Sequence, residues 1–111
     1  MAQRRELIKG SIDSLLLCLI VEQPMYGYRI IKELESRSQG YFKFKEGTLY
    51  PALHRLEKSG LIQGRWQVLS TGQQRKYYSM TAKGKASLAD SRTKWLDFLS
   101  AVSMIIRPSE A

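Results

Sequence analysis

The sequence is poor in the residues that most enzymes use for catalysis. Its 111 residues include one cysteine, Cys18, and one histidine, His54. This supply leaves little for a nucleophilic triad or a zinc site, and neither a glycine-rich phosphate loop nor an EF-hand spacing is present. His54 could act as a lone general base, but its place on the outer side of a helix favours a DNA or solvent contact. Asp90 and Asp97 are surrounded by cations, where we expect solvated ion pairs. The sequence therefore predicts a protein that is not an enzyme and holds no cofactor or metal.

The single cysteine also bears on the compartment. Cys18 lies in the apolar run LLLCLIV and has no second cysteine with which to form an intramolecular disulfide. This fits a reducing environment, in which Cys18 is expected to act as a small buried hydrophobic residue. The run is too short to span a bilayer, and the N-terminal segment MAQRRELIKG lacks a signal-peptide cleavage site. We therefore expect a soluble cytoplasmic protein.

The chain has few acidic residues for its number of cations. Eighteen Lys and Arg stand against ten Asp and Glu, a net charge of +8, and no acidic residue occurs between Glu57 and Asp90. Such an excess favours an anionic partner. Nucleic acid is the first candidate, and an acidic protein or a membrane surface comes after it.

The hydrophobic pattern predicts four helices and one hairpin. The predicted helices are residues 11–22, 26–38, 48–58 and 81–106, and the predicted strands are residues 61–69 and 75–81. Ser11 and Thr81 are suitable N-caps for the first and last helices. The fold class is therefore mostly α with a small antiparallel β-hairpin. We expect a winged helix-turn-helix in residues 1–81 and a long C-terminal dimerisation helix with its tail in residues 82–111.

The third helix has one apolar side and one polar side. On a helical wheel the core side holds Leu49, Ala52, Leu53 and Leu56, the opposite side holds Pro51, His54, Arg55 and Lys58, and Tyr50 lies on the flank. With Thr48 as N-cap, the proline falls in the first turn, where its missing N–H costs little. The polar side is either a solvated surface or the face that meets DNA.

A basic hairpin next to this helix favours the DNA interpretation. Thr48 and Tyr50 could contact phosphate or base edges, with His54 and Arg55 one turn deeper, since recognition helices insert their N-terminal residues into the major groove. The hairpin tip carries Gln73, Gln74, Arg75 and Lys76, which suit a wing that lies along a phosphate backbone. In the segment YFKFK the aromatic residues are expected to pack inward. This leaves Lys43 and Lys45 together on the other side, where we expect them to contact DNA, as we do for Lys58 of the helix.

Three segments resemble the PadR-like family of bacterial transcriptional regulators. They are MYGYRIIKEL at residues 25–34, EGTLYPALHRLEKSGLI at 46–62 and RKYYSMTAKGKASL at 75–88. The short C-terminal part resembles the small subfamily, in which one long helix mediates dimerisation. The resemblance implies a homodimeric repressor on inverted-repeat operators. It assigns DNA contacts to Thr48, Leu49, Tyr50, Arg75 and Lys76.

The last helix carries an apolar row that calls for a partner helix. The row consists of Leu88, Trp95, Phe98, Leu99, Val102, Ile105 and Ile106, and Leu7 and Ile8 could add a second layer to a dimer interface. The alternative is a terminal helix folded back on its own domain. In some members of the family a tryptophan at the position of Trp95 stacks planar hydrophobic drugs, which makes Trp95 and Phe98 candidates for binding a small hydrophobic effector. Their alternative role is packed interface core.

Two other functions remain open at this point. A winged helix can serve as a protein-docking module without specific DNA binding, which would favour apolar residues on the outer side of the third helix. The chain could also be a ligand sensor whose DNA binding is only the output. RNA is a weaker candidate partner, because few stacking aromatic residues besides Tyr50 are expected on the surface.

Overall fold

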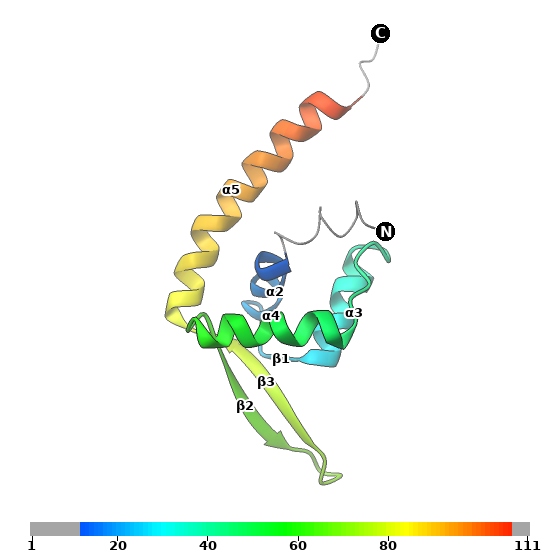
Figure 1. The fold of residues 1–111 in the computed structure, drawn as a ribbon, viewed down its shortest axis with the longest axis vertical. Coiled ribbons are helices and arrows are strands. Elements are labelled where there is room, and N and C mark those ends of the chain that lie inside the picture. The colour runs from blue at the N-terminus through cyan, green and yellow to red at the C-terminus, as the bar shows by residue number, and fades with distance from the viewer. Residues whose placement is uncertain (1–11, 108–111) are drawn as a thin grey trace.

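The computed structural model describes residues 12–107, and these form four helices and a three-stranded sheet (Figure 1). The elements in chain order are α2 (Ile12–Ile20), β1 (Met25–Tyr26), α3 (Gly27–Arg37), α4 (Glu46–Lys58), β2 (Ile62–Val68), β3 (Gln74–Met80) and α5 (Ala82–Ile106). The predicted winged-helix class is confirmed. Ser11, the expected cap of the first helix, lies outside the described residues.

The sheet consists of the predicted hairpin and one short strand that the sequence did not reveal. Strands β2 and β3 pair antiparallel from Ile62↔Met80 to Val68↔Gln74. Strand β1 pairs with β3 through Met25↔Tyr78 and Tyr26↔Tyr77, which gives the order β1-β3-β2. The hairpin extends away from the helices (Figure 1), and we call its β2–turn–β3 segment, residues 62–80, the wing.

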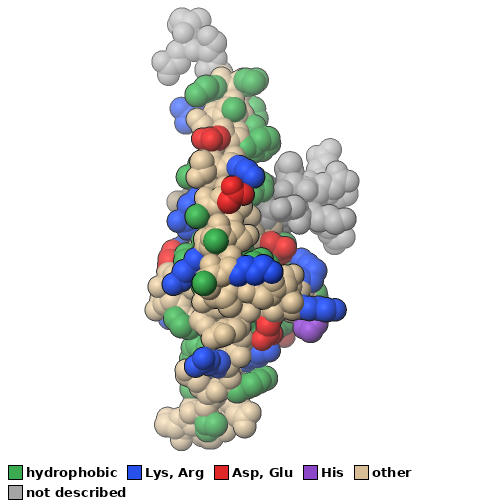
Figure 2. Space-filling model, turned by 90° about the vertical axis from the view of Figure 1, so that its left-hand side faces the viewer, with side chains coloured by type: hydrophobic (Ala, Val, Ile, Leu, Met, Phe, Trp, Pro, Cys, Tyr) green, Lys and Arg blue, Asp and Glu red, His purple; other side chains and the backbone are tan. Residues whose placement is uncertain are grey.

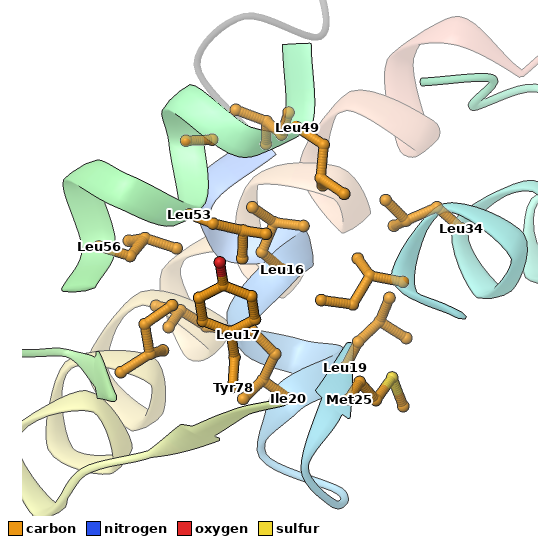
Figure 3. Close-up of a cluster of buried hydrophobic side chains, with 14 of the residues drawn as sticks. Leu16, Leu17, Leu19, Ile20, Met25, Leu34, Leu49, Leu53, Leu56 and Tyr78 are labelled. Carbon is orange, nitrogen blue, oxygen red and sulfur yellow. The ribbon is translucent and has the colours of Figure 1, made fainter. Parts of the chain in front are cut away.

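The core lies where α2, α3 and α4 meet the base of the sheet. Leu16 of α2 and Leu53 of α4 are completely buried, and the ring of Tyr78 from β3 lies among the leucines (Figure 3). The predicted core side of α4 is confirmed, since Leu49, Ala52, Leu53 and Leu56 are all buried. Cys18 packs against this cluster and is partly buried, whereas the sequence analysis expected it to be buried.

Helix α4 begins earlier than predicted. It starts at Glu46 and is preceded by Lys45 in an extended conformation, so Thr48 is not the N-cap. The backbone N–H groups of Thr48 and Leu49 both bond to the Lys45 carbonyl at 3.0 Å. Pro51 therefore lies in the second turn, where it removes the bond to the Gly47 carbonyl. The predicted placement of this proline in the first turn was wrong.

Helix α5 begins at the wing and projects beyond the body of the molecule (Figure 1). Its predicted cap is confirmed, because Thr81 Oγ1 accepts a hydrogen bond from the Gly84 N–H at 3.0 Å. Leu88 packs into the core. The helix beyond it and the wing at the other end extend the molecule to 62 Å along its longest axis (Figure 1). Within residues 12–107, no helix combines the length and the apolar character needed to cross a membrane.

Candidate nucleic-acid interface

The outer side of α4 is exposed and polar. Gly47, Pro51, His54 and Lys58 lie opposite the buried leucines at helical spacing, and all four are exposed. Lys43 and Lys45 are also exposed in the segment before the helix, while Phe42 and Phe44 pack against the core. The outer side of α4 and the two lysines before it are therefore exposed, as the sequence predicted.

Arg55 and Thr48 lie on the flank of α4 that faces α2. The guanidinium of Arg55 forms an ion pair with Asp13 of α2 at 3.1 Å. Both side chains of the pair are about half exposed, so the contact is screened by water and weak. Thr48 is exposed on the same flank, one heptad before Arg55. A base contact by Arg55 would therefore require it to leave Asp13.

Tyr50 lies on the opposite flank, against the start of α3. A Cβ atom at residue 27 would overlap the Tyr50 hydroxyl, so Gly27 gives the tyrosine ring its place. Tyr50 is still 42% exposed, and partial burial, helped by the charge of Glu46, raises the pKa of its hydroxyl. Leu49, which the family resemblance assigned to DNA contact, is fully buried. That assignment was wrong, because the core face of α4 takes the side chain.

The tip of the wing is exposed and carries two glutamines. Gln73 and Gln74 are exposed beside Gly72, whose φ of 88° suits glycine. The next residue, Arg75, places its guanidinium 4.3 Å from the centre of the Tyr26 ring. A stacked guanidinium keeps its in-plane donors, so Arg75 can still bind a phosphate.

Lys76 is bound to α4 instead of being a free cation of the wing. Its Nζ donates to Glu57 Oε1 at 3.0 Å, and the backbone N–H of Gly64 donates to Glu57 Oε2 at 3.0 Å. The hydrogen bond from Lys76 lowers the pKa of Glu57, and the same bond raises the pKa of Lys76. The sequence suggested a phosphate contact for Lys76 and did not reveal its partner.

A groove of about 600 Å³ lies between the wing and the starts of α3 and α4. Four of its aromatic residues, Tyr26, Tyr28, Trp66 and Tyr78, were not predicted from the sequence, although Trp66 is 65% exposed. Because side chains alternate along a strand, Trp66 could be placed on the same face of the sheet as Gly64. The sequence alone does not show which element packs against that face. The groove is lined by Tyr26, Gly27, Tyr28, Tyr50, Trp66, Gln73, Gln74, Arg75, Lys76 and Tyr78.

The projecting part of α5 exposes a row of large apolar side chains. Phe98, Leu99, Ile105 and Ile106 are each more than half exposed, and Figure 2 shows hydrophobic side chains gathered over this end of the helix. Leu88 was predicted at a dimer interface, but it is buried in the core of its own chain, so this assignment was wrong. Leu7 and Ile8 lie outside the described residues.

Trp95 and Phe98 lie in the middle of α5, beyond the buried Leu88. Their ring centres are 6.0 Å apart in an edge-to-face arrangement. Trp95 and Val102 are only partly exposed, in contrast to Phe98. Among residues 12–107, no group of three or more His, Cys, Asp and Glu side chains could hold a metal ion.

An exposed α4, a wing with cations and a long terminal helix define the protein as a winged helix-turn-helix of the kind found in DNA-binding regulators. Residues 16–90 match the family model of the transcriptional regulator PadR-like family. The chain therefore belongs to this family of transcriptional regulators.

The chain is also similar to individual proteins and solved structures. The chain is 36% identical to an uncharacterised protein of Lysinibacillus sphaericus over 96% of its own length and 98% of that protein. It is 32% identical to the transcriptional regulator Rv3488 of Mycobacterium tuberculosis, over 79% of this chain and 78% of that protein. A PadR-like transcriptional regulator of Bacillus cereus superimposes with a TM-score of 0.82 at 30% identity, covering 94% of this chain and 99% of the other.

Proposed function

We propose that the protein is a homodimeric repressor that binds an inverted-repeat operator in double-stranded DNA. In this proposal α4 enters the major groove with its exposed outer side, His54 and Lys58 included. The wing places Gln73, Gln74 and Arg75 on the adjacent backbone. Residues 1–81 bind DNA, and residues 82–111 join the two copies. Two-fold symmetry then sets half-sites about 34–36 Å apart.

The observation that carries the proposal is the arrangement of three exposed surfaces on one small chain. Tyr50 on the flank of α4 and Arg75 of the wing line one groove, and the polar side of α4 next to that flank is exposed. The apolar row of α5 lies on the part of the molecule that projects away from this groove (Figure 1). An exposed row of this size is typical of an interface, so a second copy of the chain can cover it without blocking DNA.

Binding to DNA is tested by fluorescence anisotropy over a salt series. The labelled duplexes are the region upstream of the protein's own gene, a duplex enriched by in vitro selection from random DNA, and a scrambled control. We expect nanomolar binding to the enriched duplex that weakens steeply with salt, because cations release counterions from the phosphates. Equal, weak binding to enriched and scrambled DNA would reject sequence-specific recognition.

The alternative function is a protein-docking module, and the outer side of α4 argues against it. A docking helix needs apolar anchor residues. The residues in that place are Gly47, Pro51, His54 and Lys58, which supply little apolar area. If no duplex binds even at low salt, the docking function becomes the better proposal.

A small hydrophobic effector is a further part of the proposal. Trp95 and Phe98 offer two aromatic rings in edge-to-face contact beside the proposed dimer interface. A planar compound that stacks on Trp95 should quench its fluorescence and lower the affinity for the operator. Quenching without any change in DNA affinity would separate ligand binding from regulation.

A further inference from the structure

The carboxylate of Glu57 connects α4 to both strands of the wing. Glu57 lies in the last turn of the helix, and its two oxygens accept from different strands. Oε1 accepts from Lys76 Nζ of β3, and Oε2 accepts from the Gly64 N–H of β2, each at 3.0 Å. We call these two contacts the Glu57 bridge.

Glycine at position 64 leaves room for the Lys76 half of the bridge. A Cβ atom there would overlap Cε of Lys76 and lie 3.0 Å from Glu57 Oε2. Among the described residues, the glycines with positive φ are Gly40, Gly60 and Gly72, so Gly64 is not needed for its backbone conformation. Gly64 therefore gives the side chains of Glu57 and Lys76 room to meet.

Ile62 and Tyr78 anchor the base of the wing in the core, but its outer half has little support besides Arg75 stacked on Tyr26. Trp66 and Val68 are 65% and 70% exposed, and the pairing with β1 reaches only Tyr77 and Tyr78 of β3. A two-stranded ribbon of this length is marginally stable by itself and free to twist. The angle between the wing and α4 therefore depends on contacts at the base of the wing, and the Glu57 bridge is the polar contact that joins them there.

By its charge alone, Glu57 should weaken DNA binding. A carboxylate beside a phosphate-binding surface repels the duplex, and by pairing with Lys76 it also removes one cation from that surface. Both side chains of the pair are about 30% exposed, so water screens the ion pair only in part. Any benefit of Glu57 to binding must therefore come from geometry.

We propose that Glu57 is a positioning residue for sequence-specific DNA binding. It holds the wing at a fixed angle to α4, so that both elements contact the same duplex, and it keeps Lys76 from adding nonspecific attraction. This inference rests on the proposed function. Losing the bridge should weaken binding to the operator and strengthen binding to unrelated DNA.

Three variants separate geometry from charge. Gly64→Ala displaces the flexible end of Lys76 without changing the net charge, and Glu57→Gln removes the ion pair together with one negative charge. The control is Glu46→Gln, which removes one negative charge from an exposed position in the first turn of the same helix. Each variant is compared with the wild type by anisotropy on an operator duplex obtained by in vitro selection and on its scrambled counterpart.

We expect the ratio of operator to scrambled affinity to fall about tenfold in Gly64→Ala and Glu57→Gln, as a lost charged hydrogen bond would predict. The salt slope on scrambled DNA should steepen by up to about 0.9, because Lys76 becomes available to a phosphate. Glu46→Gln should tighten binding to both duplexes and leave the ratio unchanged. An unchanged ratio in both Gly64→Ala and Glu57→Gln would overturn the inference.

A measurement without DNA tests the structural half of the inference. Backbone ¹⁵N relaxation in the wing, residues 65–75, should show larger motions in Gly64→Ala and Glu57→Gln than in the wild type and Glu46→Gln. Equal relaxation in all four proteins would contradict the role of the bridge. A wild type that prefers no duplex would instead reject the proposed function itself, whatever the relaxation shows.

Discussion

At the scale of single residues, Arg75 and Lys76 show how neighbouring cations can differ in role. Successive side chains of a strand point to opposite faces, so Arg75 stacks on Tyr26 while Lys76 bonds to Glu57. Arg75→Ala should flatten the salt slope of DNA binding by about 0.9, the effect of one lost phosphate contact. Lys76→Ala should flatten it far less. Anisotropy titrations in a potassium chloride series measure both slopes, and equal slopes for the two variants would contradict this division of roles.

A substitution at Gly47 should change both the stability of the protein and its affinity for DNA. A Cβ atom at this position would have no neighbour within 4 Å, and the residue lies in the first turn of a helix, where glycine costs stability relative to alanine. Gly47→Ala should therefore raise the free energy of unfolding by up to about 0.5–1 kcal/mol. Because the added methyl group points out from the DNA-facing side, we expect DNA affinity to fall in the same variant.

Urea denaturation and anisotropy on the same preparation test this pair of effects. Ser87→Ala is the control, because Ser87 is exposed on α5 and the substitution raises helix propensity away from α4. Unchanged DNA affinity in a stabilised Gly47→Ala protein would show that no duplex approaches α4 closely at this residue.

The pKa of Glu57 leads to a prediction about pH. Its pKa in the folded protein is lowered from the ordinary 4.5, chiefly by the hydrogen bond from Lys76. A group with a depressed folded pKa stabilises the fold above its unfolded pKa and loses that contribution as the pH falls through the folded pKa. Wild-type stability should therefore decline below about pH 4.5 more steeply than that of Glu57→Gln. Parallel curves from chemical denaturation at pH 3 to 7 would exclude a stabilising bridge.

At the scale of elements, the four helices and the hairpin could be predicted because their apolar residues follow regular periods. Two features were not predicted correctly, strand β1 and the start of α4. Strand β1 has only two residues, and its partner β3 comes much later in the chain, so no local pattern marks it. Helix α4 begins at Glu46, with Lys45 in the extended N-cap position. The prediction placed the start at Thr48 because threonine is a preferred N-cap residue and lysine is not.

The candidate interface was partly predictable for the same reason. A helical wheel identified the outer side of α4, since the buried leucines determine which residues lie opposite. The wheel does not say that Arg55 would meet Asp13 of α2, or that Glu57 would meet Lys76 of β3. Those contacts depend on the neighbour that packs against each flank of the helix, and periodicity within one element carries no information about that neighbour.

The start of α5 gives an element-scale prediction. Thr81 Oγ1 accepts from the Gly84 N–H, and its hydroxyl lies 2.6 Å from the carbonyl oxygen of Gly60, to which it donates. Thr81→Ala should lower the free energy of unfolding by about 1–2 kcal/mol, because the cap and the link to the preceding turn are both lost. Thr81→Ser keeps the hydroxyl and should retain most of the stability. Urea denaturation distinguishes them, and equal losses would attribute the effect to the methyl group.

At the scale of the whole molecule, the apolar row of α5 has two parts, one buried in the core of its own chain and one exposed to solvent. Near its start the row is buried, with Leu88 in the protomer core. Farther along the same face, Leu99 and Ile106 are 52% and 73% exposed. The outer part of the row therefore adds little to the stability of a single chain, and its burial in a dimer would be favourable by roughly 25 cal/mol per Å² of apolar area.

The last prediction follows from this division. The double variant Leu99→Glu/Ile105→Glu should shift the protein from dimer to monomer in size-exclusion chromatography with light scattering, because buried carboxylates would be unpaired. Circular dichroism should still show a folded winged helix, since both side chains lie outside the core. Ser100→Glu, on the opposite side of α5, is the matched control and should remain dimeric. A wild-type monomer at micromolar concentration would contradict the proposed dimer, whereas a dimeric double variant would move the interface elsewhere. Operator affinity should fall together with the dimer, because a monomer contacts one half-site and loses the second contact that the two-fold arrangement supplies.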